Sequence, residues 1–411
     1  MMRACFTVSP SGPISVGAAR IALLGYLHAR RHSGRFRLRF YDVGNDHARA
    51  DYVAAIEREL RWLGIDWDES QRQSQGLSEY LQAFERLQRT GRVYPAVDNR
   101  ESRTKRGPQS CWKFRLSDRT VGWHDLVLGP CTVALHAIAD PVVLQADGTP
   151  AACLAGVVDD IATDVTDVIR CRTGVQATAV EVDLRAALDH GRGPRFAHLP
   201  ALEDAGEKRL ARRVDARTLR SLRRDGVENV ALAAYLARLG TQDAMEPTSL
   251  PQLSTTFDLG RFSPQPAPFK AATLLALNRR VLASSDLTSV KDRLPPGATE
   301  AFWLAIRTEL DLLGEARGWW DVVAGSIVPP RVAETRLLGL ALDLLPREPW
   351  NGTVWHDWIE ALARASGWCA EALALPLRLA LTGEDGGPEL AALLPLIGRA
   401  RAIQRLRLAL Q

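Results

Sequence analysis

The sequence of 411 residues lacks any apolar run long enough for a signal peptide or a membrane span, so we expect a cytoplasmic protein with no membrane partner. Its six cysteines are isolated, with no C-x-C or C-x-x-C pair, and its eight histidines form no H-E-x-x-H spacing. These absences argue against a zinc site, any other metal site and a disulfide framework. We therefore expect free thiols that are buried or partly buried.

An excess of charge of one sign is also missing. Lysine and arginine together number 52 and aspartate and glutamate 48, which gives a net charge of +4. Any contact with nucleic acid must therefore depend on a local basic patch. The hydrophobic content of 46% is that of an ordinary globular protein, and the length predicts two or three domains.

Strands and helices alternate in the first part of the chain. The pattern predicts strands at 4–8 and 35–41 and helices at 15–31, 52–63 and 77–89. Basic and apolar residues alternate in the second strand, which suits a strand with one covered face. A strand, a glycine-bearing turn, a helix and a strand begin a doubly wound nucleotide-binding sheet, in which ligands lie at the carboxyl ends of the strands.

The rest of the chain changes character twice. Residues 98–110 read as a loop, 111–150 as strands, and 157–170 as a return to the sheet, whereas the chain after Pro194 is mostly helical. An α/β half followed by an all-α half predicts separate domains. We place them at 1–195, with an inserted subdomain near 95–145, at 196–255 and at 256–411.

Three polar segments are candidates for chemistry. The turn Ser9–Arg20 lets backbone N–H groups approach a phosphate, although a tight turn with no ligand explains it equally well. The pair Asp159-Asp160 could bind a cation or act as acid and base, but a structural role at a strand end fits better. The basic run Glu207–Arg224 suits contact with a polyanion, or else forms a solvated helix face, and Arg399–Arg407 carries the same ambiguity.

Taken together, these segments resemble glutamyl-tRNA synthetase, a class I enzyme. The family's motifs appear in order as CFTVSPSGPISVGAAR at Cys5–Arg20, LRFYDVG at Leu38–Gly44, WLGIDWDE at Trp62–Glu69, DGTP at Asp147–Pro150, VVDD at Val157–Asp160, DVIR at Asp167–Arg170, RLARR at Arg209–Arg213 and LPLRLALTG at Leu375–Gly383. The resemblance implies a Rossmann-like α/β catalytic domain, a stem-contact helical region and an all-α anticodon-binding-like domain. It also implies tRNA as a partner, ATP with Mg²⁺ if the chain is active, and no zinc, because the family's zinc-binding insertion is shortened.

The resemblance weakens where the family binds ATP. Ser15 stands at the signature histidine, Gly17 is retained, and Ala18 replaces the next glycine. In the mobile signature loop, the two lysines become Arg209 and Arg212 and the serine becomes Ala211. A planar guanidinium does not place its charge as an ammonium does, so the resemblance implies a weakened nucleotide site at Ser15, Gly17, Arg209 and Arg212.

The glutamate pocket departs further from the family. Cys5 stands at the arginine that pairs with the substrate side chain, Tyr41 at the acidic residue that meets the α-amino group, and Ala152 and Gly156 at the pocket's tyrosine and asparagine. Thr7, Ser9 and Arg170 complete the pocket positions. Since a buried carboxylate needs a cation, we expect glutamate specificity to be lost and the pocket to be larger and less polar.

Three functions remain open. The first is a tRNA-binding paralogue that does not perform ordinary glutamylation, with phosphate contacts from Arg212, Arg213, Arg217 and Arg378. The second is an active aminoacyl-tRNA ligase or amide ligase that adenylates another acid. The third is a scaffold whose helical half binds a protein partner.

Overall fold

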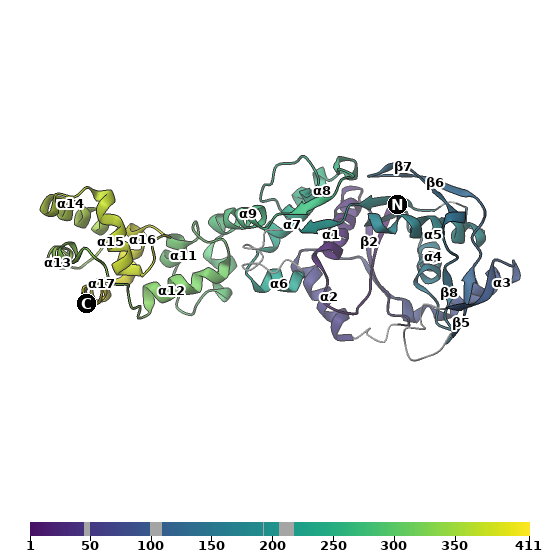
Figure 1. Cartoon of the computed structure of the whole chain (residues 1–411), viewed down its shortest axis with the longest axis horizontal. Helices are drawn as coiled ribbons and strands as arrows, with labels where there is room; N and C mark the ends of the chain where they lie inside the picture. The colour runs from purple at the N-terminus through teal and green to yellow at the C-terminus, as the bar shows by residue number, and fades with distance from the viewer. Residues whose placement is uncertain (45–49, 99–108, 192, 205–217) are drawn as a thin grey trace. The chain divides into compact units, whose positions relative to one another are not determined.

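The computed structural model describes residues 1–44, 50–98, 109–191, 193–204 and 218–411. The chain forms two compact units (Figure 1). Unit 1 comprises residues 1–224 and 229–274, and unit 2 comprises residues 225–228 and 275–411. Unit 1 takes in the predicted region 1–195 and all of 196–255 except residues 225–228, and the inner boundaries between the predicted domains stay predictions.

Unit 1 is built around a seven-stranded sheet in the order β3-β2-β1-β9-β10-β6-β7. Every neighbouring pair in the sheet is parallel except the β6–β7 hairpin, which confirms the predicted doubly wound architecture. The strands are β1 (Arg3–Val8), β2 (Arg35–Phe40), β3 (Glu69–Arg72), β6 (Thr120–Asp125), β7 (Gly129–Ala134), β9 (Asp167–Cys171) and β10 (Arg195–Leu199).

Helices cover both faces of this sheet. On β2, Phe36 points to α1 (Val16–Arg31), where its ring meets the ring of Tyr26 at 5.8 Å. Arg39, on the opposite face of β2, is buried against α4 (Ala152–Ala162). The expectation of one covered face is therefore wrong at Arg39: the basic face is covered there too, because α4 supplies carboxylates that compensate a buried arginine, whereas Arg35 is exposed.

Further helices complete the two layers. α7 (Asn229–Arg238) and α8 (Leu250–Thr256) pack on α1, whereas α5 (Val175–Ala187) packs on α4. α2 (Ala50–Trp62) and α6 (Leu219–Arg224) also belong to unit 1. The predicted helices of the first part of the chain are thus confirmed within two residues at each end.

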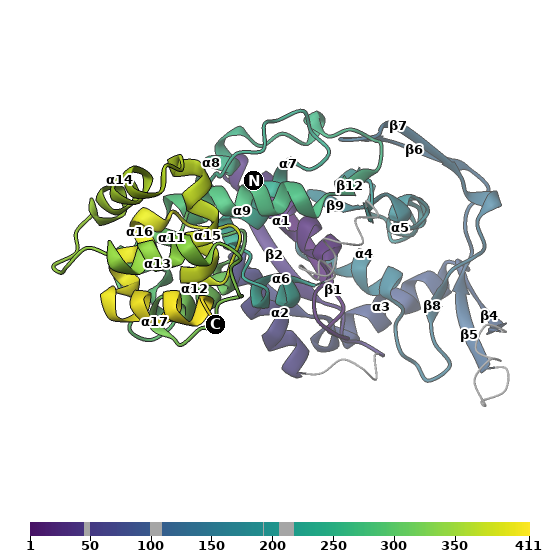
Figure 2. The same cartoon turned by 60° about the vertical axis from the view of Figure 1, so that its left-hand side comes forward.

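A smaller antiparallel sheet forms the insertion, as Figure 2 shows beside α3 (Leu77–Arg89). Its strands are β4 (Val93–Asp98), β5 (Gln109–Phe114) and β8 (Val142–Leu144). Phe84, Phe114 and Leu154 belong to one apolar core that joins this sheet to α3 and α4. The strand-like reading of residues 111–150 is confirmed.

Two secondary-structure predictions are wrong. Residues 157–162 belong to helix α4, and the sheet resumes only at Asp167, because a short apolar run reads equally well as a buried helix or a buried strand. Strands also continue after Pro194, since β10 lies in the main sheet and β11 (Leu202–Asp204) pairs with β12 (Ala267–Phe269).

In its described residues, unit 2 is all helical, as expected. Its helices are the greater part of α9 (Ala271–Ser284), α10 (Leu287–Val290), α11 (Glu300–Ile306), α12 (Ala316–Ala324), α13 (Thr335–Asp343), α14 (Val354–Ser366), α15 (Ala370–Thr382), α16 (Leu390–Ile397) and α17 (Arg399–Ala409). Trp303 and Trp358 are each fully buried, in two separate apolar cores.

The six thiols are free. Cys5 and Cys111 are buried, and Cys131, Cys153 and Cys171 are partly buried. Cys369 is exposed, so the expectation of burial is wrong for this residue. No helix in the described ranges is both long and apolar enough to cross a membrane.

Candidate active site

The turn before α1 brings together the first candidate residues. Ser15 is the N-cap of α1, and its hydroxyl accepts a hydrogen bond from the backbone N–H of Ala18 at 3.2 Å. A Cβ added to Gly17 would meet only the Ser15 hydroxyl, at 4.0 Å. The turn is therefore open to an approaching phosphate, but the side chain at position 15 supplies a hydroxyl that already caps the helix.

The basic run returns to this turn. Arg209, Ala211, Arg212, Arg213 and Arg217 lie outside the described residues. Immediately after them, Thr218 forms a β-bridge with Ser15, and the N–H of Leu219 donates to the carbonyl of Ile14 at 3.2 Å. Thr218 and Leu219, which lie within the basic run, are thereby fixed next to the start of α1.

Cys5 and Thr7 lie on the same face of β1, where Cys5 is buried and Thr7 is exposed. Cys5 is buried among Val165, Val168 and Phe196, and its sulfur lies 3.9 Å from the Thr7 hydroxyl. Burial raises the pKa of the Cys5 thiol to about 11. The position is thus neutral at neutral pH and carries no charge that could pair with a carboxylate.

Tyr41 follows β2 and packs beside Val43, Ala155 and Val158. Burial raises the pKa of its hydroxyl, which accepts a hydrogen bond from the backbone N–H of Ala152. Because α4 has no side-chain cap of its own, the tyrosine satisfies one of the free N–H groups at its start. A neutral aromatic ring therefore stands where the resemblance places a carboxylate.

Gly156 lies one turn further along α4. A Cβ at this glycine would meet no atom within 4 Å, so the pocket wall is open at this point. Ser9, at the end of β1, is partly buried and makes a polar interaction. Cys5, Thr7, Tyr41, Ala152 and Gly156 are thus brought to the β1–β2–α4 region that the resemblance assigns to the amino acid.

Arg170 is held by Glu181, a residue that sequence reasoning missed. The guanidinium donates to both carboxylate oxygens of Glu181, at 3.0 and 2.7 Å, and to the hydroxyl of Thr178 at 3.3 Å. Burial alone would lower the pKa of Arg170, but the charge of Glu181 and its hydrogen bonds hold it above the ordinary value. The only retained pocket cation among the predicted positions is therefore already neutralised.

The Asp159-Asp160 pair has a structural role, but within helix α4 and not at a strand end. Asp160 accepts a hydrogen bond from Arg39 at 2.7 Å, and Asp159 lies 3.4 Å from the same guanidinium. Asp159 also accepts hydrogen bonds from Gln71, Gln73 and Tyr80. Arg39, alternating with phenylalanines in a strand, gave no signal of burial in the sequence.

In the helical half, the arginines that the sequence suggested for contact with tRNA make hydrogen bonds within unit 2. Arg378 donates to the carbonyls of Gly386 and Pro388, at 3.4 and 3.0 Å. In the terminal helix, Arg399, Arg401 and the buried Arg405 each donate to backbone carbonyls. Arginines of this terminal basic helix therefore bind backbone carbonyls within unit 2. The arginine spacing in the sequence did not predict this role.

Among the described residues, no three His, Cys, Asp or Glu side chains gather as they would around a metal ion. The absence of zinc stays a prediction.

Comparisons with known proteins agree with this geometry. A family model described as tRNA synthetases class I (E and Q), catalytic domain, matches residues 1–106 and 96–274, and one described as Anticodon binding domain matches residues 332–410. Glutamate--tRNA ligase 2 of Granulibacter bethesdensis is 47% identical over 441 residues, which cover 99% of this chain and 98% of the relative. The protein of the same name from Acidiphilium cryptum is 45% identical over 442 residues, with all of both chains covered.

A solved structure supports the fold. The crystal structure of a glutamate tRNA ligase from Elizabethkingia meningosepticum, in complex with its amino acid, aligns with a TM-score of 0.82 at 21% identity, covering 100% of this chain and 99% of that one. The ordered motifs, the parallel sheet, the helical second unit and the full-length relatives all agree. This chain belongs to the glutamyl-tRNA synthetase family of class I tRNA synthetases.

Proposed function

We propose that this chain binds tRNA but does not perform ordinary glutamylation. The observation that carries the proposal is the ion pair of Arg170 with Glu181, in which both oxygens of the glutamate are engaged. A substrate carboxylate would have to displace an internal carboxylate that is already held at hydrogen-bonding distance. An intramolecular partner has no translational entropy to lose, so it competes strongly with a free ligand.

The rest of the pocket offers no replacement cation. The buried Cys5 thiol stays protonated at neutral pH, and the Tyr41 hydroxyl is neutral. Arg39 lies nearby, but Asp159 and Asp160 both compensate it. A glutamate side chain would enter as an unpaired buried charge, whose desolvation costs several kcal/mol, on the order of the pocket's whole binding energy.

In the nucleotide part of the site, the backbone turn of the family is retained better than its cationic side chains. The open turn at Gly17 and the start of α1 fit a phosphate group, and we propose that Arg209 and Arg212 contribute its cationic contacts. When bound, ATP with Mg²⁺ supplies the activating phosphate chemistry of this family. Ser15 holds a neutral hydroxyl at this turn, which stabilises developing negative charge less than a cation does.

Binding of tRNA is the part of the family's activity that the chain is best equipped to retain. We propose Arg212, Arg213 and Arg217 as phosphate contacts, because Thr218, the described residue that follows them, lies beside the start of α1. Arg378 donates twice within unit 2, so its contribution to tRNA is through charge at longer range.

A mobility shift with total tRNA tests this binding. We expect a complex at low salt, with an affinity that falls as salt rises. The double substitution Arg212→Ala with Arg213→Ala should lower the salt slope by about 1.4, since each phosphate contact on a single strand contributes roughly 0.7. A double variant at Arg58 and Arg89, which are exposed arginines on α2 and α3, should leave the slope unchanged. Absence of any shift would instead favour the protein scaffold.

A second function is favoured by the open pocket wall. Gly156 faces free space, and a cavity of about 220 Å³ lies beside the Cys5 cluster, with both apolar residues (Trp123, Val182, Phe196) and charged residues (Asp160, Glu181, Arg185) in its wall. These features suit a larger acid than glutamate, which the chain would adenylate for transfer to tRNA or to an amine. ATP–pyrophosphate exchange across a panel of amino acids separates the two functions, because exchange with any acid other than glutamate supports the second and excludes an inactive site.

A further inference from the structure

A second cavity opens on the side of the sheet away from the candidate active site. Its volume is about 550 Å³, within the size range of small-ligand sites. The last turn of α1, the residue after β6, the start of β10 and the 3₁₀ turn Leu259–Arg261 form its wall. α1 ends here, and β9 and β10 begin here, so the cavity lies at the amino ends of β9 and β10, beside the end of β6. The candidate active site lies at the carboxyl ends, and the two are distinct.

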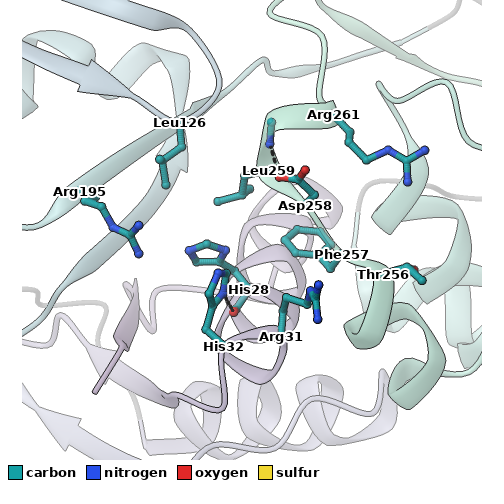
Figure 3. A pocket seen from close by; sticks show the side chains of 11 residues that line it. His28, Arg31, His32, Leu126, Arg195, Thr256, Phe257, Asp258, Leu259 and Arg261 are labelled. Atoms are coloured by element: carbon teal, nitrogen blue, oxygen red, sulfur yellow. Dashed lines mark hydrogen bonds between the residues drawn. The ribbon is translucent and has the colours of Figure 1, made fainter.

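The wall of this cavity is predominantly basic. The side chains that line it include His28, Arg31, His32, Arg195 and Arg261, against the single carboxylate of Asp258. Figure 3 shows Arg195 on one side of the cavity and Arg31 and Arg261 on the other, with His28 between them. Cationic groups from three separate elements thus surround one space, as in a site that grips an anion from several directions.

The arginines keep donors available for a ligand. Arg31 makes no hydrogen bond or ion pair with the described part of the chain. Arg195 contacts one oxygen of the buried Asp167 at 2.7 Å, and Arg261 pairs with Asp243, but both side chains remain at least half exposed. Since a guanidinium has five N–H donors, one ion pair leaves most of them free.

Asp258 is engaged with the backbone of its own turn. Its carboxylate accepts a hydrogen bond from the backbone N–H of Gly260 at 2.9 Å and caps the 3₁₀ turn. Phe257 and Leu259, on either side of it, are buried and supply an apolar wall. An anion with an apolar body matches this combination of a cationic rim and an apolar wall.

We propose that this cavity binds a small phosphate monoester with an aromatic or apolar body. A phosphate monoester has three terminal oxygens, which can accept hydrogen bonds from arginines on α1, β10 and the 3₁₀ turn at once. A planar carboxylate has only two oxygens and suits three separate donors less well. The ring or chain of the ligand packs on Phe257 and Leu259. This inference is independent of the proposed tRNA function, because none of the cavity residues belongs to the candidate active site.

Titration calorimetry of the full chain with phenyl phosphate tests the site. Arg31→Ala should weaken binding about tenfold, because charge-assisted hydrogen bonds are the strong ones, and Arg89→Ala should leave it unchanged. Both arginines are exposed and each is the last residue of its helix, so the two variants are matched. Asp258→Asn keeps a cap on the turn and removes the only carboxylate in the wall, so it should tighten binding about threefold.

Inorganic phosphate and benzoate complete the experiment. We expect both to bind more weakly than phenyl phosphate, the first because it lacks the apolar body and the second because it lacks the third oxygen. Equal affinity for benzoate would overturn the assignment of a phosphate. No binding of phenyl phosphate, or binding that neither Arg31→Ala nor Asp258→Asn changes, would overturn the site itself, since the ligand would then be absent or lie in the other cleft.

Discussion

At the scale of single residues, the arginines near the amino-acid pocket are paired with carboxylates of the protein itself. The buried Arg39 and the partly buried Arg170 are each held by carboxylates of helices α4 and α5. The sequence identified Arg170 as a pocket residue but gave no indication of Glu181. The two are separated by 11 positions, and only the packing of α5 on β9 and β10 brings them together.

Glu181→Gln should make Arg170 available. The substitution keeps the shape of the side chain and removes its charge, so a small carboxylate such as L-glutamate should bind about tenfold more tightly than to the wild type, as expected for a charge-assisted hydrogen bond. Titration calorimetry measures the affinity, and Glu85→Gln, on the exposed face of α3, is the matched control. Unchanged affinity in Glu181→Gln would show that the ion pair does not block the pocket.

Tyr80→Phe tests the buried network around Asp159. The hydroxyl of Tyr80 donates to this carboxylate at 2.9 Å, and the ring is fully buried. Removal of one of several donors to a buried charge should lower the free energy of unfolding by about 1–2 kcal/mol. Urea denaturation measures the change. Tyr94→Phe, which removes a hydroxyl that donates to the less buried Asp140 at 2.8 Å, is the control, and an equal loss in the two variants would contradict a special role for the Asp159 network.

At the scale of elements, one buried hydrogen-bonded pair ties the β6–β7 hairpin to its neighbour β10 in the main sheet. His198 of β10 and Asp125 at the end of β6 lie 2.5 Å apart, and Asp125 also accepts backbone N–H groups from Val127, Leu128 and His198. The aspartate thus accepts hydrogen bonds both from the backbone of the β6–β7 turn and from the backbone of β10.

The stability that Asp125 supplies should disappear in acid. Burial alone would raise its pKa, but the hydrogen bonds from His198 and from the backbone lower it to about 2. A carboxyl with a lowered folded-state pKa stabilises the protein above its ordinary pKa of about 3.9, and this contribution is lost as the pH falls towards 2. The difference in unfolding free energy between wild type and Asp125→Asn should therefore shrink from pH 5 to pH 2.

Urea titrations at several pH values measure this difference. Asp118→Asn changes an exposed carboxylate and should show no such pH dependence. A constant difference for Asp125→Asn across the range would contradict the lowered pKa.

In unit 2, Arg405 joins α17 to its neighbours. The buried guanidinium donates to the carbonyls of Leu381, Val322 and Gly325, at 2.7, 2.5 and 3.1 Å. Arg405→Ala leaves these carbonyls without a partner and should destabilise unit 2 by about 3–5 kcal/mol. Thermal unfolding checks this result against Arg407→Ala, an exposed change on the same helix. Equal effects of the two variants would contradict a structural role for Arg405.

Elements were predictable where their periodicity was long. The helices at 16–31 and 77–89 and the strand at 35–40 follow from spacing alone, since each has enough residues to show its period. Residues 157–162 were misread because six residues of apolar and acidic character suit a helix and a strand equally. The burial of Arg39 and Arg405 could not be read from sequence, because their compensating groups come from distant segments.

At the scale of the whole molecule, the order of elements and the family were predictable from the sequence, because ordered motifs spread along the whole chain carry that information. The consequences of the altered motifs depend on contacts: Tyr41 with the start of α4, Cys5 with its apolar neighbours, and Arg170 with Glu181. Each contact supplies a physical reason for the proposed loss of glutamate binding.

Charging of total tRNA with labelled glutamate, in the presence of ATP and Mg²⁺, tests this central claim most directly. The Glutamate--tRNA ligase 2 of Granulibacter bethesdensis, assayed in parallel, is the natural control because it is 47% identical along the full length. We predict that this chain shifts tRNA in a gel under the same conditions but transfers no glutamate to it. Formation of glutamyl-tRNA at a rate comparable to that of the control would contradict the account.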